Sequence, residues 1–280
     1  MDLGRVFDKI EDKAANHVQT DPGDYMGADG LLMCGQCHTP KQCRIELFGR
    51  IRTPYCLCKC QVDKRDAEDA EIKRQERERR INKMRKMGFP DAEMQRCNFD
   101  LDDNQNPKIT NAAKKYAENF KDIKKRGSGL LLFGNVGSGK TFTAACIANA
   151  LIDRGYPCLV TNFARLTNTI SGMYDGKQAY IDGLNKFDLL VIDDLGSERE
   201  TEYMGEIVHN IIDSRYRANL PLIITTNLTL TDLQNPSDVR KQRIYSRLLE
   251  MCIPINVPGD DRRLKKGKNE YEYMKNLLDI

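Results

Sequence analysis

The octapeptide from Gly134 to Thr141 could bind the phosphates of a nucleotide. It reads GNVGSGKT and matches the pattern G-x-x-x-x-G-K-[S/T] at every fixed position. Glycines in such a loop allow a sharp turn, so that successive backbone N–H groups face one anion. Lys140 is expected to reach the β- and γ-phosphates, and the Thr141 hydroxyl to ligate Mg²⁺. The predicted phosphate-binding residues are Gly134, Asn135, Val136, Gly137, Ser138, Gly139, Lys140 and Thr141.

A pair of carboxylates supplies the other half of such a site. Asp193 and Asp194 follow a run of apolar residues, and Asp193 is expected to hold Mg²⁺ beside Thr141, directly or through water. Asp194 is the candidate to orient or activate the attacking water, although it is one methylene shorter than the glutamate usually found there. Glu198 is the alternative. Asn227, after a later apolar run, could hydrogen-bond the γ-phosphate or that water, or could be an ordinary turn residue.

The cysteines indicate a separate chemistry. Six of the ten lie between Cys34 and Cys60, and in a chain without a signal-peptide pattern, clustered cysteines more often bind metal than form disulfides. Two cysteine pairs match a zinc ribbon, in which four thiolates surround one ion, although iron–sulfur centres also favour thiolates. The predicted ligands are Cys34, Cys37, Cys58 and Cys60. Cys56 could replace one of the last pair, and the weaker candidates are Cys43 and His38.

Alternating strands and helices must position the nucleotide site. The predicted strands are Leu130–Phe133, Cys158–Thr161, Phe187–Asp194, Pro221–Asn227 and Cys252–Val257. The predicted helices are Thr110–Lys124, Phe142–Ile152, Asn162–Tyr174, Met204–Arg217 and Asp238–Met251, and Ser171–Lys186 is expected to be a helix end or a loop. This alternation predicts an α/β fold with a parallel sheet between helices. Polar residues at the carboxyl ends of its strands should converge on the ligand.

Composition sets outer limits on the function. The 280 residues contain 44 Lys and Arg and 41 Asp and Glu, for a net charge of +3, so whole-chain charge does not argue for nucleic acid. No apolar run is long enough to span a membrane, and the expected location is the cytoplasm.

We predict five segments: a polar N-terminal segment (1–30), a cysteine-rich module (31–62), a charged helical linker (63–98), an ATPase domain (99–265) and a tail (266–280). The linker could be a rod that binds DNA or a partner, or a solvated spacer.

Five sequence blocks together resemble the DnaC-type replicative helicase loaders, which are AAA+ ATPases, and the related IstB transposition ATPases are close in pattern. The blocks are GNVGSGKT, LLVIDDLGSE, IIDSRY, LPLIITTNLT and RIYSRLLEMC. The cysteine-rich head resembles that of the phage and Gram-positive versions. The resemblance implies a five-stranded parallel sheet in the order 5-1-4-3-2. It makes Gly134–Thr141 the Walker A loop, Asp193 and Asp194 the Walker B pair, and Asn227 sensor 1.

The resemblance also assigns two arginines. Arg247 matches the arginine finger that reaches the nucleotide of a neighbouring subunit, although Arg240 and Arg243 precede it and could be mistaken for it. The alternative is that Arg247 pairs with Glu250 on the helix surface. Arg263 falls where a sensor 2 arginine would sit, and the adjacent Arg262 competes for that role.

The function implied by the resemblance is ATP-dependent loading of a replicative hexameric helicase onto single-stranded DNA. The head would grip the helicase, while the ATPase domain would bind ATP and Mg²⁺, hydrolyse ATP weakly, self-associate and contact DNA. The alternative is an IstB-like transposition-targeting ATPase that binds duplex DNA and recruits a transposase. A third possibility is an adaptor that does not use nucleotide.

Overall fold

The structure is a computed structural model that describes residues 20–47, 49–196, 202–236 and 238–279. The chain divides into two units, Met1–Glu78 and Arg79–Ile280. Glu198, the alternative to Asp194, lies outside the described residues, as does most of the polar segment 1–30.

Short antiparallel strands build the first unit. They form two pairs, β1 (Tyr25–Met26) with β2 (Leu32–Met33), and β3 (Ile45–Leu47) with β4 (Arg50–Arg52). Between the pairs, the fully buried Lys41 donates to the carboxylates of Asp21 at 2.7 Å and Asp24 at 2.5 Å. Two-stranded sheets of this length are marginal in water. The buried Lys41–Asp24 ion pair and the cysteines described below must therefore supply part of the stability of this unit.

A charged helix, α2, runs from Lys59 to Gly88 and confirms the helix predicted in the linker. It begins earlier than predicted, so that Cys60 lies in its first turn. Its residues up to Glu78 belong to the first unit and the remainder to the second. Most of its side chains are exposed, which fits the density of charge in its sequence, while Ile81 and Met84 near its end pack against the core of the second unit.

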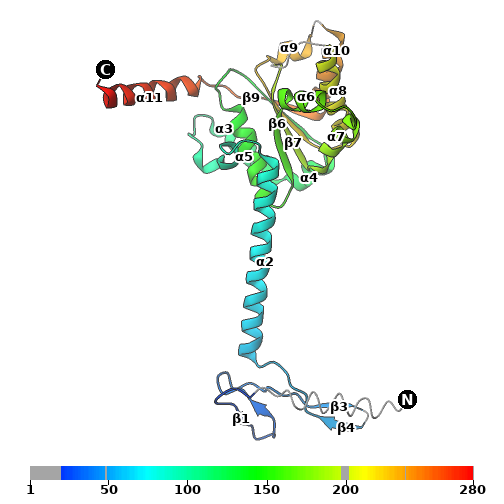
Figure 1. The fold of residues 1–280 in the computed structure, drawn as a ribbon, viewed down its shortest axis with the longest axis vertical. Coiled ribbons are helices and arrows are strands. Elements are labelled where there is room, and N and C mark those ends of the chain that lie inside the picture. Colours follow the sequence, from blue (N-terminus) through cyan, green and yellow to red (C-terminus); the bar gives the residue numbers. More distant parts are fainter. Residues whose placement is uncertain (1–19, 48, 197–201, 237, 280) are drawn as a thin grey trace. The chain divides into compact units, whose positions relative to one another are not determined.

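The second unit contains a five-stranded parallel sheet (Figure 1). Its strands, in chain order, are β5 (Gly129–Phe133), β6 (Cys158–Asn162), β7 (Leu189–Leu195), β8 (Leu222–Thr226) and β9 (Cys252–Asn256). Across the sheet the order is β6-β7-β8-β5-β9, and every neighbouring pair is parallel. Numbered by position in the chain, this is the order 5-1-4-3-2, which confirms the arrangement that the resemblance implied.

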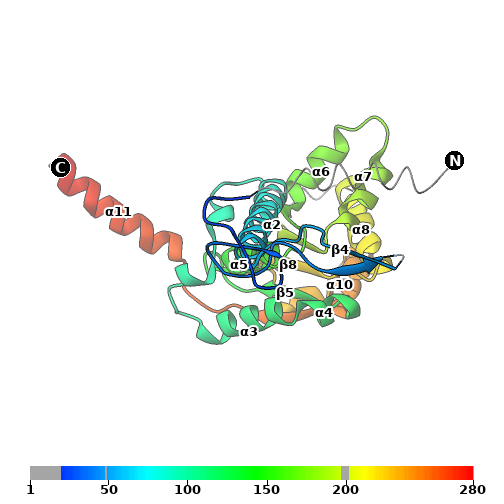
Figure 2. The ribbon, with the colours of Figure 1, turned by 90° about the horizontal axis from the view of Figure 1, so that it is seen from below.

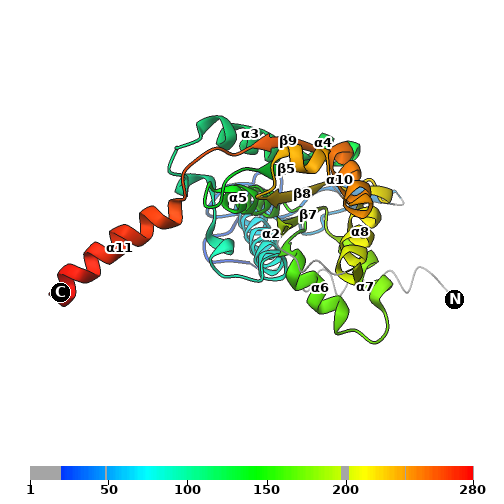
Figure 3. The same cartoon turned by 90° about the horizontal axis from the view of Figure 1, so that it is seen from above.

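Helices cover both faces of this sheet. They are α3 (Pro107–Glu118), α4 (Phe120–Arg126), α5 (Lys140–Asp153), α6 (Phe163–Ser171), α7 (Lys177–Gly183), α8 (Glu202–Arg217), α9 (Leu230–Gln234) and α10 (Val239–Met251). The last helix, α11 (Arg262–Leu278), extends away from the sheet. Short 3-10 turns lie at η1 (Met94–Arg96), η2 (Phe99–Leu101) and η3 (Leu184–Lys186). Figure 3 shows α8 and α10 on one side of the sheet and α5 on the other.

Alternation along β5 explains why there are two cores. Leu131 packs into the cluster with α6, α8 and α10, whereas Leu130 and Leu132 pack into the cluster with α3 and α5. Successive side chains of a strand point to opposite faces. Because both faces are covered, the strand reads as an uninterrupted apolar run, as expected for a parallel sheet.

The single helix predicted over Thr110–Lys124 is wrong, because the structure has two helices there, α3 and α4 (Figure 2). They meet at Asn119, whose side-chain amide donates to the carbonyl of Lys115 at 2.8 Å. Asparagine competes with helical hydrogen bonds in this way. The break lets Phe120 become buried and pack edge-on against Tyr156.

The stretch predicted as a helix end or loop, Ser171–Lys186, contains the short helix α7 and the turn η3. Ile181 and Leu184 are buried there, but the few apolar residues of this stretch are scattered among polar ones and give too weak a periodicity to predict a helix. The preceding helix, α6, ends at Ser171, before the predicted end at Tyr174. The five sheet strands and the other predicted helices agree with prediction to within a few residues. The short strands β1 to β4, the short α9 and the long α11, most of which lies in the predicted tail 266–280, were not predicted.

Candidate functional site

The predicted phosphate-binding loop joins β5 to α5, and it needs its glycines. Gly137 has φ 74° and Gly139 has φ 98°, in the region that favours glycine. A Cβ on Gly137 would also lie 2.0 Å from a carboxylate oxygen of Asp261. Any larger residue would therefore displace either the loop or the segment that lies against it. The backbone can come close to an anion here only because these side chains are absent.

Lys140 opens α5, and its ammonium group is fully hydrogen-bonded. It donates to the carbonyls of Gly134 at 2.9 Å and Asn135 at 2.6 Å, and to the side-chain oxygen of Asn227 at 2.8 Å. The residue is 7% exposed, and burial lowers its pKa. A buried cation with three donors at the mouth of a glycine loop fits an anionic phosphate ligand.

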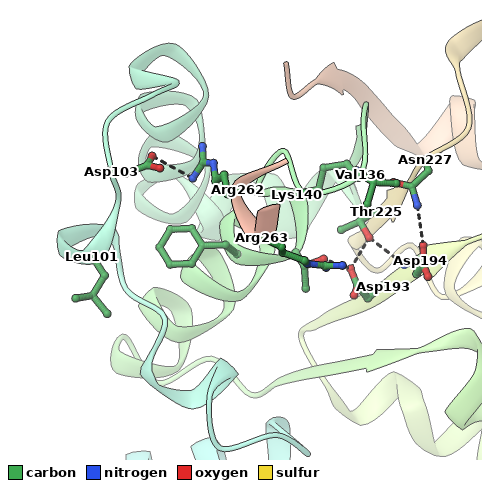
Figure 4. Close-up of a pocket in the computed structure, with 14 residues that line it drawn as sticks. Leu101, Asp103, Val136, Lys140, Asp193, Asp194, Thr225, Asn227, Arg262 and Arg263 are labelled. Carbon is green, nitrogen blue, oxygen red and sulfur yellow. Dashed lines mark hydrogen bonds and ion pairs between the residues drawn. The ribbon is translucent and has the colours of Figure 1, made fainter. Parts of the chain in front are cut away.

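The predicted carboxylates lie opposite the loop (Figure 4). The Thr141 hydroxyl donates to Oδ1 of Asp193 at 2.7 Å, so the two predicted Mg²⁺ ligands are neighbours. The amide of Asn227 donates to Oδ1 of Asp194 at 3.2 Å. Oxygen donors from two carboxylates and a hydroxyl are the ligand set that Mg²⁺ prefers beside phosphates. The structure thus gathers residues that the sequence places on three separate segments.

These residues line a cavity of about 570 Å³. Both candidates for sensor 2 line this cavity, but their side chains point in different directions. Figure 4 shows Arg263 pointing toward Asp193 and Arg262 pointing toward Asp103. Arg262 pairs with Asp103 at 3.1 Å. The lining residues are Leu101, Asp103, Val136, Gly137, Gly139, Lys140, Thr141, Phe142, Asp193, Asp194, Thr225, Asn227, Arg262 and Arg263.

Sequence reasoning missed four of these lining residues: Leu101, Asp103, Phe142 and Thr225. Leu101 and Asp103 precede α3, where no motif marks them, and Phe142 was assigned only to the helix after the loop. Thr225 could have been found, because it occupies the penultimate position of a strand whose polar tip was already predicted to face the ligand. Of the predicted loop residues, Ser138 is fully buried.

Arg247 lies on α10, away from this cavity. It forms an ion pair with Asp213 of α8 at 2.6 Å and donates to Nε2 of His209 at 2.7 Å. The surface pair with Glu250 is not formed, since Glu250 instead accepts from the hydroxyl of Tyr216 at 2.8 Å. Within its own chain, Arg247 is therefore bound to α8. Arg240 pairs with Glu202 and Asp238.

The four predicted thiol ligands meet in the first unit. The sulfur atoms of Cys34, Cys37, Cys58 and Cys60 all lie within 4.8 Å of one another, with Cys34–Cys60 at 3.6 Å and Cys58–Cys60 at 3.3 Å. Zn–S bonds of 2.3 Å in a tetrahedron place sulfurs about 3.8 Å apart. The cluster therefore fits a tetrahedral metal ion.

The other cysteine and histidine candidates make different contacts. The thiols of Cys43 and Cys56 face the carbonyls of Pro54 and Pro40. His38 lies beside Tyr25, whose hydroxyl is 3.2 Å from Nδ1 of the ring. None of the three belongs to the cluster of four.

Electrostatics within the cluster favour a cation. The hydroxyl of Thr39 lowers the pKa of Cys37 to about 5, and backbone amides of Cys37 and Gln36 lower the pKa of Cys34. The neighbouring thiols of Cys58 and Cys34 raise the pKa of Cys60 to about 12. Four thiolates this close repel one another, and a divalent ion removes that repulsion.

The sheet order, the glycine loop between β5 and α5, and the paired aspartates on β7 define an ATP-binding domain of the AAA+ type. The model of the IstB-like ATP binding protein family matches residues 64–270, and the chain belongs to this family. None of the helices in the described part of the chain is both long and apolar enough to cross a membrane.

Similar proteins include replicative helicase loaders. The chain is 25% identical to the loader DnaI of Bacillus subtilis over 167 residues, which cover 55% of this chain and 52% of that protein. It is 28% identical to the loader DnaC of Buchnera aphidicola subsp. Baizongia pistaciae over 180 residues, which cover 62% and 71%. A crystal structure of DnaI aligns with a TM-score of 0.51 and 26% identity, over 61% of this chain and 96% of that one. The alignment spans about half the length of the Bacillus protein. The resemblance predicted from the motifs is confirmed.

Proposed function

We propose that this protein is an ATP-dependent loader that places a replicative hexameric helicase on single-stranded DNA. One observation carries the proposal. One cavity is lined by Lys140, which donates to Asn227, and by Thr141, which donates to Asp193. It lies in a domain whose relatives are named replicative helicase loaders. The matched region covers 52% of the Bacillus loader and 71% of the Buchnera loader, so a decisive experiment must include a helicase.

Each group at the site then has a role. Residues Gly134–Thr141 would hold the ATP phosphates, and Thr141 with Asp193 would hold Mg²⁺, which offsets charge on the phosphates. Asp194 would orient the attacking water, and Asn227 would contact the γ-phosphate or that water. Arg263, which lines the same cavity, would act as sensor 2. Because an aspartate reaches less far than a glutamate, we expect slow hydrolysis suited to a timing step.

The first unit and the family relationship suggest the partners. The cysteine cluster would bind zinc, because four thiolates in a tetrahedral arrangement suit this ion, and the head so formed would contact the helicase. The ATPase domain would self-associate, with Arg247 reaching the nucleotide of a neighbour. To do so, Arg247 must leave Asp213 and His209, which hold it in the isolated chain.

The experiment combines the protein, the replicative helicase of the same source and circular single-stranded DNA coated with single-strand-binding protein. The amount of helicase bound to the DNA is measured by gel filtration, and its activity by unwinding of an annealed strand. Three reactions are compared: the parent protein with ATP, the parent protein without nucleotide, and the Lys140→Ala variant with ATP. We expect loading only with the parent protein and ATP. Equal helicase loading in all three reactions would overturn ATP dependence. Capture of a transposase on duplex DNA, without loading, would instead support the transposition alternative.

A further inference from the structure

Thr225 of β8 occupies an unusual position next to both predicted catalytic carboxylates. It is 1% exposed, and its hydroxyl makes two hydrogen bonds to β7. It donates to Oδ1 of Asp193 at 2.5 Å and accepts from the backbone N–H of Asp194 at 2.9 Å. A threonine hydroxyl has one proton and two lone pairs. A single buried group therefore contacts both members of the Walker B pair.

The strand register explains why one residue can do this. Ile192 pairs with Ile224 and Leu195 pairs with Thr226, so β7 has one more residue than β8 over this stretch. Asp193 and Asp194 together lie opposite Thr225, which is the arrangement of a β-bulge. Asp194 adopts φ 63°, a conformation that costs a residue with a side chain about 1 kcal/mol or more. The bulge thus needs contacts that hold it in place.

We propose that Thr225 is a positioning residue that sets the spacing between the Mg²⁺-binding carboxylate of Asp193 and the water-orienting carboxylate of Asp194. Its hydroxyl fixes the first through the carboxylate and the second through the peptide N–H. Asp193 Oδ1 is held from the other side by Thr141 at 2.7 Å. The carboxylate therefore cannot turn without breaking two hydrogen bonds. This inference rests on the proposed ATPase site and adds a residue to it.

The test compares Thr225→Val with Thr225→Ser. Valine keeps the branched shape and removes the hydroxyl, whereas serine keeps both hydrogen bonds. A misplacement of about 1 Å at a reacting centre can cost 10²-fold in rate. We expect Thr225→Val to lower kcat for ATP hydrolysis by about 10²-fold and to raise the Mg²⁺ concentration needed for half-maximal rate. Thr225→Ser should stay within about threefold of the parent on both measures.

Thr226→Val is the matched control on the same strand. Thr226 is also buried, and its hydroxyl donates to the backbone carbonyl of Leu195 at 2.8 Å rather than to a carboxylate. We expect it to keep the Mg²⁺ dependence of the parent. If Thr226→Val and Thr225→Val lose hydrolysis equally and with the same Mg²⁺ dependence, general support of the bulge explains the loss and the proposal is wrong.

Nucleotide binding without Mg²⁺, measured in EDTA, separates this proposal from the proposed function. We expect Thr225→Val to bind like the parent in EDTA and to lose the gain in affinity that Mg²⁺ gives the parent. If the parent protein does not hydrolyse ATP, the ATPase function is contradicted. The role of Thr225 can still be tested in that case, because the gain in nucleotide affinity with Mg²⁺ does not depend on hydrolysis. Parent-like hydrolysis and Mg²⁺ response in Thr225→Val would overturn the proposal, as would a Thr225→Ser variant as impaired as the valine variant.

Discussion

Lys140 joins three parts of the nucleotide site through its ammonium group, which contacts two loop carbonyls and Asn227. Burial lowers its pKa, so the charge is held there at a cost in desolvation. We expect Lys140→Ala to lose tight ATP binding while keeping the fold. Titration calorimetry measures affinity and circular dichroism the fold, and Lys121→Ala, at an exposed position on α4, is the control. Equal affinity in Lys140→Ala and the parent would contradict the site assignment.

Arg247 could have either of two roles. It could stabilise its own chain through an ion pair, or it could act as an arginine finger at the nucleotide of another subunit. An arginine supplied to a γ-phosphate in this way is worth roughly 10³–10⁵ in rate. We expect Arg247→Ala to bind ATP nearly like the parent and to hydrolyse it poorly. Mixing it with Lys140→Ala should restore activity, because one interface then combines an intact site with an intact arginine. The measurement is ATPase rate against mixing ratio at concentrations where the protein self-associates.

Asp213→Asn supplies the control for Arg247, because it removes the negative charge that holds the guanidinium in the isolated chain. If Arg247 acts in trans, this variant should hydrolyse ATP at least as fast as the parent, since release of the arginine becomes easier. If Arg247→Ala and Asp213→Asn lose the same stability and the same activity, the ion pair is structural and the finger assignment fails.

At the scale of elements, a buried arginine of α8 donates hydrogen bonds to the segments that lead into two sheet strands. Arg215, in the last turn of α8, is fully buried and donates to the carbonyls of Phe187 at 2.8 Å and Pro221 at 2.5 Å. These carbonyls precede β7 and β8, at the ends of the strands opposite the nucleotide. Burial lowers the pKa of Arg215 to about 10, which leaves it charged at neutral pH.

We expect Arg215→Met to destabilise the second unit by about 2–5 kcal/mol, because two buried carbonyls lose their donor. Arg217→Met, at an exposed residue of the same turn, should cost less than about 1 kcal/mol. Urea unfolding followed by circular dichroism measures both. The Arg215 assignment would be wrong if the two variants unfolded at the same urea concentration.

Sequence patterns predicted most strands and helices of the second unit, because the apolar residues that pack into its cores recur at regular spacings along the chain. Leu130–Phe133 and Leu189–Ile192 are uninterrupted apolar runs, and the motifs fix which of their ends carries the site. The bulge at Asp194 could not be predicted, since it depends on how β7 registers against β8 rather than on β7 alone. The break at Asn119 could not be predicted for a similar reason. It combines a local hydrogen bond from the Asn119 side chain to the carbonyl of Lys115 with the tertiary burial of Phe120, which the local sequence does not show.

The whole molecule consists of two units with different sources of stability. The second has two apolar cores, whereas the first has short strands, the buried Lys41–Asp24 ion pair and the cysteine cluster. We expect about one zinc per chain, measured by elemental analysis of protein purified without chelators. Removing the zinc should unfold the first unit and spare ATP binding, because metal binding and folding are coupled in such small units.

Serine variants test which cysteines hold the metal. The double variant Cys34→Ser, Cys58→Ser should lose zinc, since it removes two of the four clustered sulfurs. The double variant Cys43→Ser, Cys56→Ser should keep it, because these thiols face backbone carbonyls instead. Zinc retained in the first variant, or lost in the second, would refute the ligand set.

The contact between the phosphate-binding loop and the start of α11 has a mechanical consequence. The N–H of Arg262 donates to the carbonyl of Gly137 at 3.2 Å, and Asp261, which caps the helix, packs against the same glycine. From Arg263 onward the described residues of α11 are exposed. With 17 residues, the helix is about 25 Å long. Because the base of α11 contacts the loop, a tilt of about 10° at that end would displace the far end of the helix by about 4 Å.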